Sequence, residues 1–434
     1  MTTLIEEELQ HDLVDEVICP HCWAHFPPEN VLFISEHEAL RGDSRLGPDA
    51  QMRFLPTRFN AKCQALDPMG TICLDMACPR CHLDIPRPLL EAKCRFLSVL
   101  GAPASGKSYF LGSMLWQTRK VLLQDFGYSF GDAHPEFNKV VNSYEEAMFL
   151  NPKREQEIPV GELIPKTQFT GNQLYDQVLM GDQTLQLPKP FLFEYRVPNP
   201  AGDPRTRLLC LYDNAGESFL AGSEDANARE VTKHLAQSSA LFFVFDPLQD
   251  PRFVDALCEA DPTITPDSIP AIAHRQETIL REASTRIRRH LSLTSDARHK
   301  NPLIVIVGKY DVWWRLLPEA KQTDWIRHSK RNGHGDGQDP GISLAAIQRI
   351  SDQLRDLLAK LCPELVGTAD FFSETVLFLP VSALGQSPKP RKVEGQDRQV
   401  PMIRPRDIQP FWVELPLIWF LTTLRTHKEK HQKV

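Results

Sequence analysis

The stretch GAPASGKS, residues 101–108, has the residue types and the spacing needed to hold a chain of phosphates. It fits the pattern G-x-x-x-x-G-K-[ST], with an apolar run before it and a helix-like pattern after it. Glycines let the backbone turn sharply and present several N–H groups on one concave surface, to which the following helix adds its N-terminal partial charge. The Lys107 ammonium would reach the outer phosphates, and the Ser108 hydroxyl would bind Mg²⁺. The stretch predicts a nucleoside triphosphate site, although such a loop could also only turn a strand into a helix. The residues expected to line the site are Gly101, Ala104, Ser105, Gly106, Lys107, Ser108 and Tyr109, with Lys107 also acting in catalysis.

A carboxylate follows directly on the apolar run LLCLY, at the start of DNAGE, residues 213–217. At that place Asp213 would give a second Mg²⁺ contact. ATPases commonly have an acidic residue directly after this Asp as their catalytic base, and Asn214 stands there instead. The pattern Asp-x-x-Gly-Glu resembles the switch II signature of GTPases, in which the glycine amide senses the γ-phosphate and the next residue positions the attacking water. Those roles would fall on Gly216 and Glu217. Because a carboxylate only accepts hydrogen bonds and repels the γ-phosphate, Glu217 predicts slow turnover without a partner.

Two further motifs follow later apolar runs. GKYD, residues 308–311, resembles the base-recognition motif Asn-Lys-x-Asp, with Gly308 in place of Asn. Asp311 would accept hydrogen bonds from guanine N1–H and the exocyclic N2, donors that adenine lacks there, and the Lys309 stem would lie along the base. Losing the Asn side chain removes contacts that tie this loop to its surroundings. The later residues Ser382, Ala383 and Leu384 resemble the element whose backbone N–H faces guanine O6.

The four motifs stand in the order found in GTPases, each at the carboxyl end of an apolar run, where ligands of parallel sheets bind. Residues 94–425 therefore resemble a divergent P-loop GTPase domain of the translation-factor and Ras-like superclass. A large insertion and a Cys-rich leader resemble the bacterial double-GTPase families of multigene conflict systems. This resemblance implies a P-loop fold, GTP and Mg²⁺ as ligands, and a switch or regulatory role in such a system.

The resemblance also implies a switch I threonine, whose hydroxyl would complete the Mg²⁺ shell, between Ser108 and Asp213. Thr170, in the stretch PKTQFTGN, is the residue assigned to this role, and Thr167 is the alternative. A plain loop threonine remains the third interpretation of both residues.

Four cysteines stand in two C-P-x-C turns, CPHC at 19–22 and CPRC at 78–81. Each turn presents two thiolates, and two such turns make a tetrahedral S₄ site that suits Zn²⁺. The predicted zinc ligands are Cys19, Cys22, Cys78 and Cys81, with an inserted loop or strand between the two turns. The alternatives left open are Cys63 and Cys73 in place of one pair, His21, His25 or His82 as substitutes, and reduced cysteines without metal.

The composition is that of a globular protein, with 42% hydrophobic and 24% charged residues. A formal net charge of −7 gives no reason to expect nucleic acid or an anionic membrane as an obligatory partner. The apolar run 411–424 is too short to span a bilayer, and the chain opens without a charged-then-apolar leader. We expect a cytoplasmic protein, in which paired cysteines indicate metal and not disulfides.

The chain divides into a Cys-rich zinc-ribbon-like module, residues 1–93, and an α/β P-loop domain, residues 94–434, with a mostly parallel sheet and helices on both faces. An insertion is expected at about 125–205, a Pro- and Lys/Arg-rich loop at 387–406, and a closing helix from about 411. The strands expected from short apolar runs are Phe96–Leu100, Arg207–Tyr212, Ala240–Phe245, Leu303–Val307 and Val376–Val381.

Three functions remain open on the sequence. The chain could be a slow Mg²⁺-dependent GTP hydrolase that acts as a switch, or a nucleotide-binding scaffold that docks a protein partner through the zinc module. The third is an ATPase in which GKYD is a coincidence. Because residues 94–425 have their own sheet core, nucleotide binding is expected to survive the loss of one zinc ligand.

Overall fold

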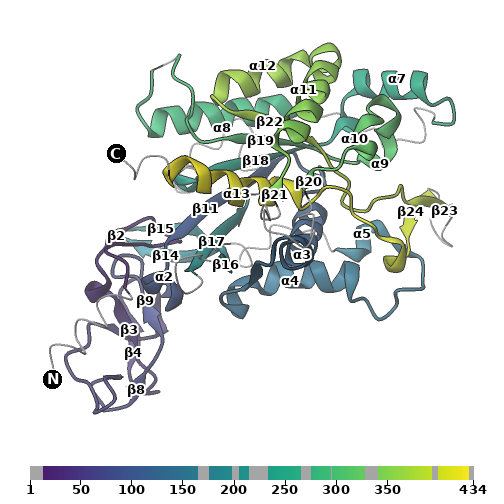
Figure 1. The fold of residues 1–434 in the computed structure, drawn as a ribbon. Coiled ribbons are helices and arrows are strands. Elements are labelled where there is room, and N and C mark those ends of the chain that lie inside the picture. Colours follow the sequence, from purple (N-terminus) through teal and green to yellow (C-terminus); the bar gives the residue numbers. More distant parts are fainter. Residues whose placement is uncertain are drawn as a thin grey trace, which may run out of the picture.

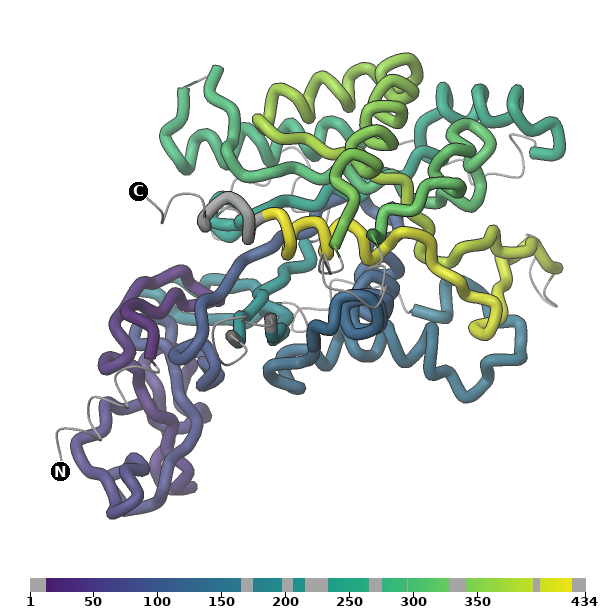
Figure 2. Tube along the Cα trace, viewed as in Figure 1, coloured from purple at the N-terminus to yellow at the C-terminus, as the bar shows by residue number. Residues whose placement is uncertain are grey.

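The computed structural model describes residues 13–164, 175–197, 205–214, 233–264, 275–294, 296–327, 341–392 and 399–429. A large, mostly parallel sheet lies at its centre, with helices on both faces and a smaller β-rich lobe at one end (Figures 1 and 2). The fold is therefore mixed α/β, as the alternation of apolar runs and amphipathic stretches predicts.

The central sheet has seven strands in the order β12-β16-β17-β11-β18-β19-β22. The neighbours from β17 to β22 are parallel, whereas β16 runs antiparallel to both β12 and β17. The five strands expected from the sequence are all present, each within two residues of its expected ends. The bounds are β12 Ser129–Asp132, β16 Phe191–Val197, β17 Arg205–Asp213, β11 Cys94–Gly101, β18 Ala240–Phe245, β19 Leu303–Val307 and β22 Val376–Pro380.

Helices cover the two faces of this sheet (Figure 1). On one face α3 packs against α4, β11, β12 and α13, and on the other α8, α11 and α12 pack against one another and the sheet. The helices α8 and α11 bury the apolar stripe that faces the sheet, which is why these sequences form amphipathic helices. The bounds are α3 Lys107–Phe126, α4 Pro135–Phe149, α7 Pro251–Ala260, α8 Gln276–His290, α11 Leu344–Leu361, α12 Pro363–Phe372 and α13 Leu415–Glu429.

The smaller lobe, coloured purple in Figure 2, is made of residues 13–93 and consists of short strands. Two hairpins, β1–β2 and β9–β10, carry the two Cys-Pro-x-Cys turns at their tips, and the strands between them form the inserted segment. The bounds are β1 Val17–Ile18, β2 His25–Phe26, β3 Leu32–Ile34, β4 Arg41–Asp43, β5 Gly47–Gln51, β6 Arg53–Phe54, β7 Ala65–Leu66, β8 Ile72–Cys73, β9 Met76–Ala77, β10 Asp84–Ile85 and α2 Pro88–Glu91. We call residues 13–93 the Cys module.

The Cys module and the central sheet share one apolar cluster. Side chains of a strand alternate between its two faces, so in β17 Leu208, Cys210 and Tyr212 face the Cys module while Leu209 and Leu211 face the other side. The Cys module thus covers one face of β11, β16 and β17, as helices cover other parts of the sheet.

Two expectations about loops and ends need correction. The stretch 387–406 is not a plain loop, because β23 (Lys389–Lys392) and β24 (Gln399–Ile403) form a hairpin on β13 (Ile158–Pro159). The closing helix starts at Leu415 and not at about 411, since Phe411 is held in an extended bridge with Ser382.

The predicted insertion is partly built into the sheet, because it contributes the edge strand β12 and its neighbour β16. It also contains α4, the short helix α5 and a separate hairpin. The bounds of the remaining small elements are α5 Val160–Leu163, β14 Tyr175–Met180, β15 Gln183–Pro188, η3 Pro247–Gln249, α9 Tyr310–Trp313, α10 Glu319–Gln322, β20 Ile326–Arg327 and β21 Gly341–Ile342.

Candidate functional site

The loop that connects β11 to α3 carries the predicted phosphate-binding motif. Its last residue, Gly106, has φ 89°, a left-handed conformation that glycine adopts without steric cost. Gly101 lies so close to β18 that a Cβ atom on it would stand 2.6 Å from the Val244 carbonyl oxygen. The two glycines of the motif are thus required by the backbone turn and by the close approach of a neighbouring strand.

Lys107, the first residue of α3, folds back over this loop. Its Nζ donates hydrogen bonds of 2.9 Å to the carbonyl oxygens of Gly101 and Ala102. Asp213 is paired with Val99 in the register of β17 and β11, which places it beside the same loop. Burial raises the pKa of Asp213, and the nearby Lys107 ammonium lowers it by a smaller amount, so the two charges interact. The motif residues GAPASGKS and Asp213 therefore form one group.

Two buried oxygens in this group have no hydrogen-bond partner among the described residues. They are Ser105 Oγ and Asp213 Oδ1. Burial outweighs the nearby ammonium and raises the pKa of Asp213 from 3.8 to about 6. Buried oxygens without partners are uncommon in folded proteins, and a bound cation and phosphate oxygens would satisfy them. The donor set fits Mg²⁺, which prefers a carboxylate, a hydroxyl and phosphate oxygens.

Tyr109, next to Ser108, ties the insertion to the phosphate loop. Its hydroxyl donates to the Val160 carbonyl and accepts from the Ile164 backbone N–H at 3.3 Å. Burial raises the pKa of Tyr109 to about 12, so it stays a donor at neutral pH. Residues 160–164, which precede the predicted switch I threonines, are thus bonded to Tyr109, the residue after the proposed Mg²⁺ ligand Ser108. Thr167 and Thr170 themselves lie outside the described residues, as do Gly216 and Glu217 of the switch II motif.

The base-recognition motif and the Ser-Ala-Leu motif meet at the ends of the neighbouring strands β19 and β22. Ser382 Oγ donates to Asp311 Oδ1 at 2.5 Å, and Ser387 Oγ donates to Asp311 Oδ2 at 3.1 Å. The Tyr310 backbone N–H donates to the Val381 carbonyl oxygen at 3.0 Å, which joins the two loops directly. Two distant sequence motifs therefore form one structural unit around the Asp311 carboxylate.

The C-terminal segment and α3 hold the Ser-Ala-Leu loop in place. Ser382 and Phe411 exchange backbone hydrogen bonds, and Ser113 Oγ on α3 donates to the Ala383 carbonyl oxygen at 2.9 Å. Gly385 has φ 74°, and a Cβ there would overlap the Gln409 carbonyl oxygen at 1.6 Å. The loop is thus fixed between the first helix of the domain and the segment before the last one.

Two residues that the sequence motifs do not include, Asp246 and Gln249, connect these loops. Lys309, with φ 56°, forms an ion pair of 2.6 Å with the buried Asp246. Three residues after Asp246, Gln249 Nε2 donates to the Pro103 carbonyl oxygen in the phosphate loop at 3.3 Å. The short helix η3 thus joins the base-recognition loop to the phosphate loop. A polar residue directly after the apolar run 240–245 was the available signal, the same signal that marked Asp213.

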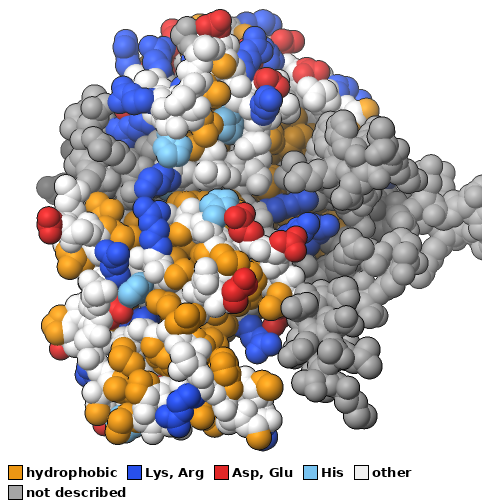
Figure 3. All heavy atoms as spheres, turned by 90° about the vertical axis from the view of Figure 1, so that its left-hand side faces the viewer, with side chains coloured by type: hydrophobic (Ala, Val, Ile, Leu, Met, Phe, Trp, Pro, Cys, Tyr) orange, Lys and Arg blue, Asp and Glu red, His pale blue; other side chains and the backbone are white. Residues whose placement is uncertain are grey.

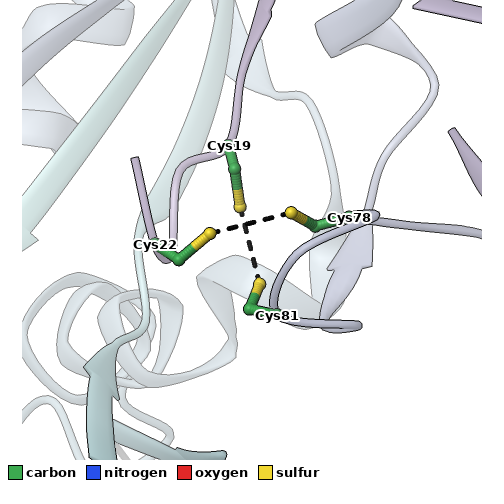
Figure 4. Close-up of side chains that lie close together, drawn as sticks. All are labelled: Cys19, Cys22, Cys78 and Cys81. Carbon is green, nitrogen blue, oxygen red and sulfur yellow. Dashed lines mark hydrogen bonds between the residues drawn. The ribbon is translucent and has the colours of Figure 1, made fainter. Parts of the chain in front are cut away.

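The four cysteines of the two turns come together, as Figure 4 shows. All are buried, their sulfurs lie within 4.8 Å of one another, and the pairs Cys19–Cys81 and Cys22–Cys78 are each 3.7 Å apart. Four sulfurs at about 2.3 Å from a central Zn²⁺ in a tetrahedron would be about 3.8 Å apart. The donor type, the number of donors and the spacing of the cluster all fit zinc.

The hairpins hold the two Cys turns in the same conformation. The Cys19 N–H donates to the Ala24 carbonyl oxygen and the Cys78 N–H to the Leu83 carbonyl oxygen, both at 2.9 Å. Burial raises the pKa of the Cys19 thiol well above its ordinary value, so a thiolate there needs a cation beside it. The alternatives Cys63, Cys73, His21, His25 and His82 lie outside the cluster.

None of the described helices is long and apolar enough to cross a bilayer.

No protein-family model matches the chain. The chain is 26% identical over 353 residues to the "Putative ESX-1 scaffolding and assembly protein SaeC" of Mycolicibacterium smegmatis, across 79% of this chain and 78% of that protein. Among solved structures it matches the GTP-bound GTPase-like domain of Ski7 from S. cerevisiae, with 12% sequence identity and a TM-score of 0.29. That match covers 77% of this chain and 51% of the other, so the chain spans about half of that neighbour's length. The relative from Mycolicibacterium smegmatis is thus a protein named for scaffolding and assembly.

Proposed function

We propose that this chain binds guanine nucleotide with Mg²⁺, hydrolyses GTP slowly, and carries a structural zinc ion in its Cys module. The observation that carries this proposal is the meeting of three motifs and Asp213 at the carboxyl edge of the central sheet. The phosphate loop follows β11, Asp213 ends β17, and the loops of Asp311 and Ser382 follow β19 and β22. Ligands of open α/β sheets bind at this edge, where the strand order reverses.

The Mg²⁺ part of the proposal rests on the two buried oxygens without partners. Ser105 Oγ and Asp213 Oδ1 lie beside Lys107, where phosphate oxygens and a hydrated cation would satisfy them. Lys107 would exchange its bonds to the loop carbonyls for bonds to phosphate, and Ser108 would be the second protein ligand of the cation.

The choice of guanine rests on Asp311. Its carboxylate stands at the end of β19 and is held by two serine hydroxyls, so it can accept the two donors of guanine but would repel the acceptor N1 of adenine. A competition titration tests this choice: labelled GTP should be displaced by GTP and GDP and not by ATP at equal concentration. Displacement by ATP would favour the ATPase alternative.

The phosphate loop has its own test. Lys107→Ala should weaken GTP binding roughly 10- to 150-fold, because one or more charge-assisted hydrogen bonds are lost. The exposed Lys120, on the same helix, gives the matched control Lys120→Ala, which should bind GTP as the unaltered protein does. An unchanged affinity in a folded Lys107→Ala protein would contradict the proposed phosphate site.

A scaffold role is the second candidate, and one surface favours it. In the inserted segment of the Cys module, Leu55, Phe59, Met69, Ile72 and Leu74 are between 42% and 64% exposed. Figure 3 shows hydrophobic side chains gathered over the lower part of this face of the molecule. The exposed charges of residues 55–75 are those of Arg58, Lys62 and Asp75, while Asp67 is buried. We infer that this surface, the apolar tip, docks a protein through an apolar patch of that protein.

The two candidates are separable by turnover and by cross-linking. Steady GTP turnover that needs Mg²⁺ would favour the switch, and binding without turnover would favour the scaffold. For the tip, lysine cross-links from Lys62 to one reproducible partner in extract of the source cells should disappear in Phe59→Ser/Leu74→Ser. Cross-links that persist in this double variant would contradict docking at the apolar tip.

A further inference from the structure

The first Cys turn of the Cys module touches the strand that ends at Asp213. The Tyr212 hydroxyl donates a 2.5 Å hydrogen bond to the carbonyl oxygen of Pro20, which lies between Cys19 and Cys22 in that turn. Tyr212 is 1% exposed, and Pro20 is also buried. This bond is therefore shielded from water, and it connects the backbone of the cluster's own turn to the residue before Asp213.

An aromatic contact fixes the same junction from a second direction. The Trp23 ring, directly after Cys22, meets the Phe96 ring of β11 edge-on at a centroid distance of 4.5 Å and lies 5.7 Å from the Tyr212 ring. Phe96 and Tyr212 lie on the neighbouring strands β11 and β17, on the face that the Cys module covers. The turn is thus packed onto both strands that carry the proposed nucleotide site.

Tyr212 also contacts His234, which follows the segment 215–232 in the chain. The Tyr212 ring lies 4.9 Å from the ring of His234. His234 Nε2 and Asn214 Oδ1 are 2.6 Å apart, and Asn214 donates from its side chain to the Val99 carbonyl oxygen at 3.0 Å. His234 and Asn214 are buried, at 0% and 1% exposure. Asn214, just before the segment, and His234, just after it, are therefore joined to each other, and the His234 ring also contacts the Tyr212 ring.

We propose that Tyr212 is a positioning residue that couples metal binding in the Cys cluster to Mg²⁺–nucleotide binding at Asp213. A metal ion joins the two Cys turns, and the first turn then holds Tyr212 through the Pro20 carbonyl oxygen. Tyr212 and Asp213 are neighbours on one extended strand with side chains on opposite faces, so a shift of the backbone at Tyr212 also moves Asp213. This inference rests on the proposed function, because it needs both a metal in the cluster and a nucleotide at the sheet edge.

The coupling must act in both directions. If the metal-loaded turn favours the Asp213 position that binds Mg²⁺–nucleotide, then Mg²⁺–nucleotide must tighten metal binding by the same factor. Couplings of this kind typically change an affinity by about 5- to 150-fold. A packing contact without such coupling would change the stability of the fold and leave both affinities unchanged.

The test uses the full chain and Tyr212→Phe, which keeps the ring and removes the hydroxyl. The matched control is Tyr195→Phe, a buried tyrosine on the adjacent strand β16 that faces away from the Cys module. We expect Tyr212→Phe to keep its zinc content and to bind GTP about 5- to 50-fold more weakly in the presence of Mg²⁺. Without Mg²⁺ its GTP affinity should equal that of the control, because Asp213 acts through the cation.

The reciprocal measurement follows zinc release to a chromogenic chelator. Mg²⁺–GTP should slow the release from the unaltered protein and from Tyr195→Phe, and should have little effect on Tyr212→Phe. Equal GTP affinities for the two variants, or release rates that nucleotide does not change, would overturn the coupling while leaving both sites intact. An unaltered protein that binds no GTP, or contains no zinc, would instead refute the proposed function and the coupling with it.

Discussion

Ser382, after the end of β22, donates a hydrogen bond of 2.5 Å to the carboxylate of Asp311, after the end of β19. The two residues are 71 positions apart in the chain and belong to different sequence motifs. Ser382 Oγ also accepts a hydrogen bond from the Gly385 N–H at 2.8 Å, so its hydroxyl hydrogen is directed at Asp311. The orientation of the proposed base-recognition carboxylate is thus determined by the neighbouring loop.

This relationship predicts different effects for two substitutions. Asp311→Asn should abolish the preference for GTP over ATP, because the amide places a donor where guanine needs an acceptor. Ser382→Ala should weaken GTP binding by only about 3- to 10-fold and keep the preference, because one orienting hydrogen bond is lost. Competition titrations with both nucleotides measure this, with the exposed Asp255 of α7 as the control Asp255→Asn. A preference that survives in Asp311→Asn would contradict the assignment.

Gly308 offers a gain-of-affinity experiment. A Cβ atom there would meet only the Phe245 carbonyl oxygen, at 3.5 Å, which is an ordinary contact. Gly308→Asn should therefore fold, and it should tighten GTP binding by restoring a side chain that ties the loop to its surroundings. Gly385→Asn is the contrasting variant, because its Cβ would overlap the Gln409 carbonyl oxygen and distort the Ser382 loop. Calorimetric titration and thermal melts measure both effects, and weaker GTP binding in Gly308→Asn would contradict the prediction.

The raised pKa of Asp213 predicts a pH dependence with a definite sign. Mg²⁺ binds the ionised carboxylate, so the Mg²⁺-dependent part of GTP binding should fall as pH drops through about 6. Without ligand the sign is opposite: the folded protein binds this proton more tightly than the unfolded chain, so this group destabilises the fold as pH rises from 3.8 to about 6.

Asp213→Asn should remove both effects. At pH 8 it should raise the free energy of unfolding of the ligand-free protein by about 1–3 kcal/mol, because a buried charge is gone. It should also reduce the effect of Mg²⁺ on GTP binding, since Ser108 is then the one proposed protein ligand left. Denaturant melts at pH 5 and pH 8 measure the first effect. A variant less stable than the unaltered protein at pH 8 would show that Asp213 is paired more strongly than its burial suggests.

The Cys cluster predicts one zinc ion per chain. Single Cys→Ser substitutions at 19, 22, 78 or 81 should remove the metal and destabilise the Cys module, because a small lobe of short strands depends on the metal for its folding free energy. Cys63→Ser and Cys73→Ser are matched controls that should keep the full metal content, since these residues lie outside the cluster. Metal analysis of the six variants measures this, and zinc retained without Cys78 or Cys81 would rule out a four-cysteine site.

The elements of the sheet could be predicted from the sequence because local patterns specify them. A short, wholly apolar run such as 303–307 is typical of a strand in a parallel sheet that is covered on both faces. The residue types and spacing of Gly101 to Ser108 indicate a phosphate loop when they follow such a run. Each C-P-x-C turn could be recognised for the same reason, because it is complete within four residues.

The contacts between these elements were decided only by the tertiary structure. No local pattern shows that Asp246 would neutralise Lys309, or that the stretch 387–406 would pair as strands with β13, because each partner lies far away in sequence. The same holds for the Cys module. The sequence favoured a separate unit, and nucleotide binding was expected to survive the loss of one of its zinc ligands. In the fold the module covers β11 and β17, with Tyr212 and Pro20 joined at the contact, because the alternating side chains of β17 leave an apolar face that needs a cover.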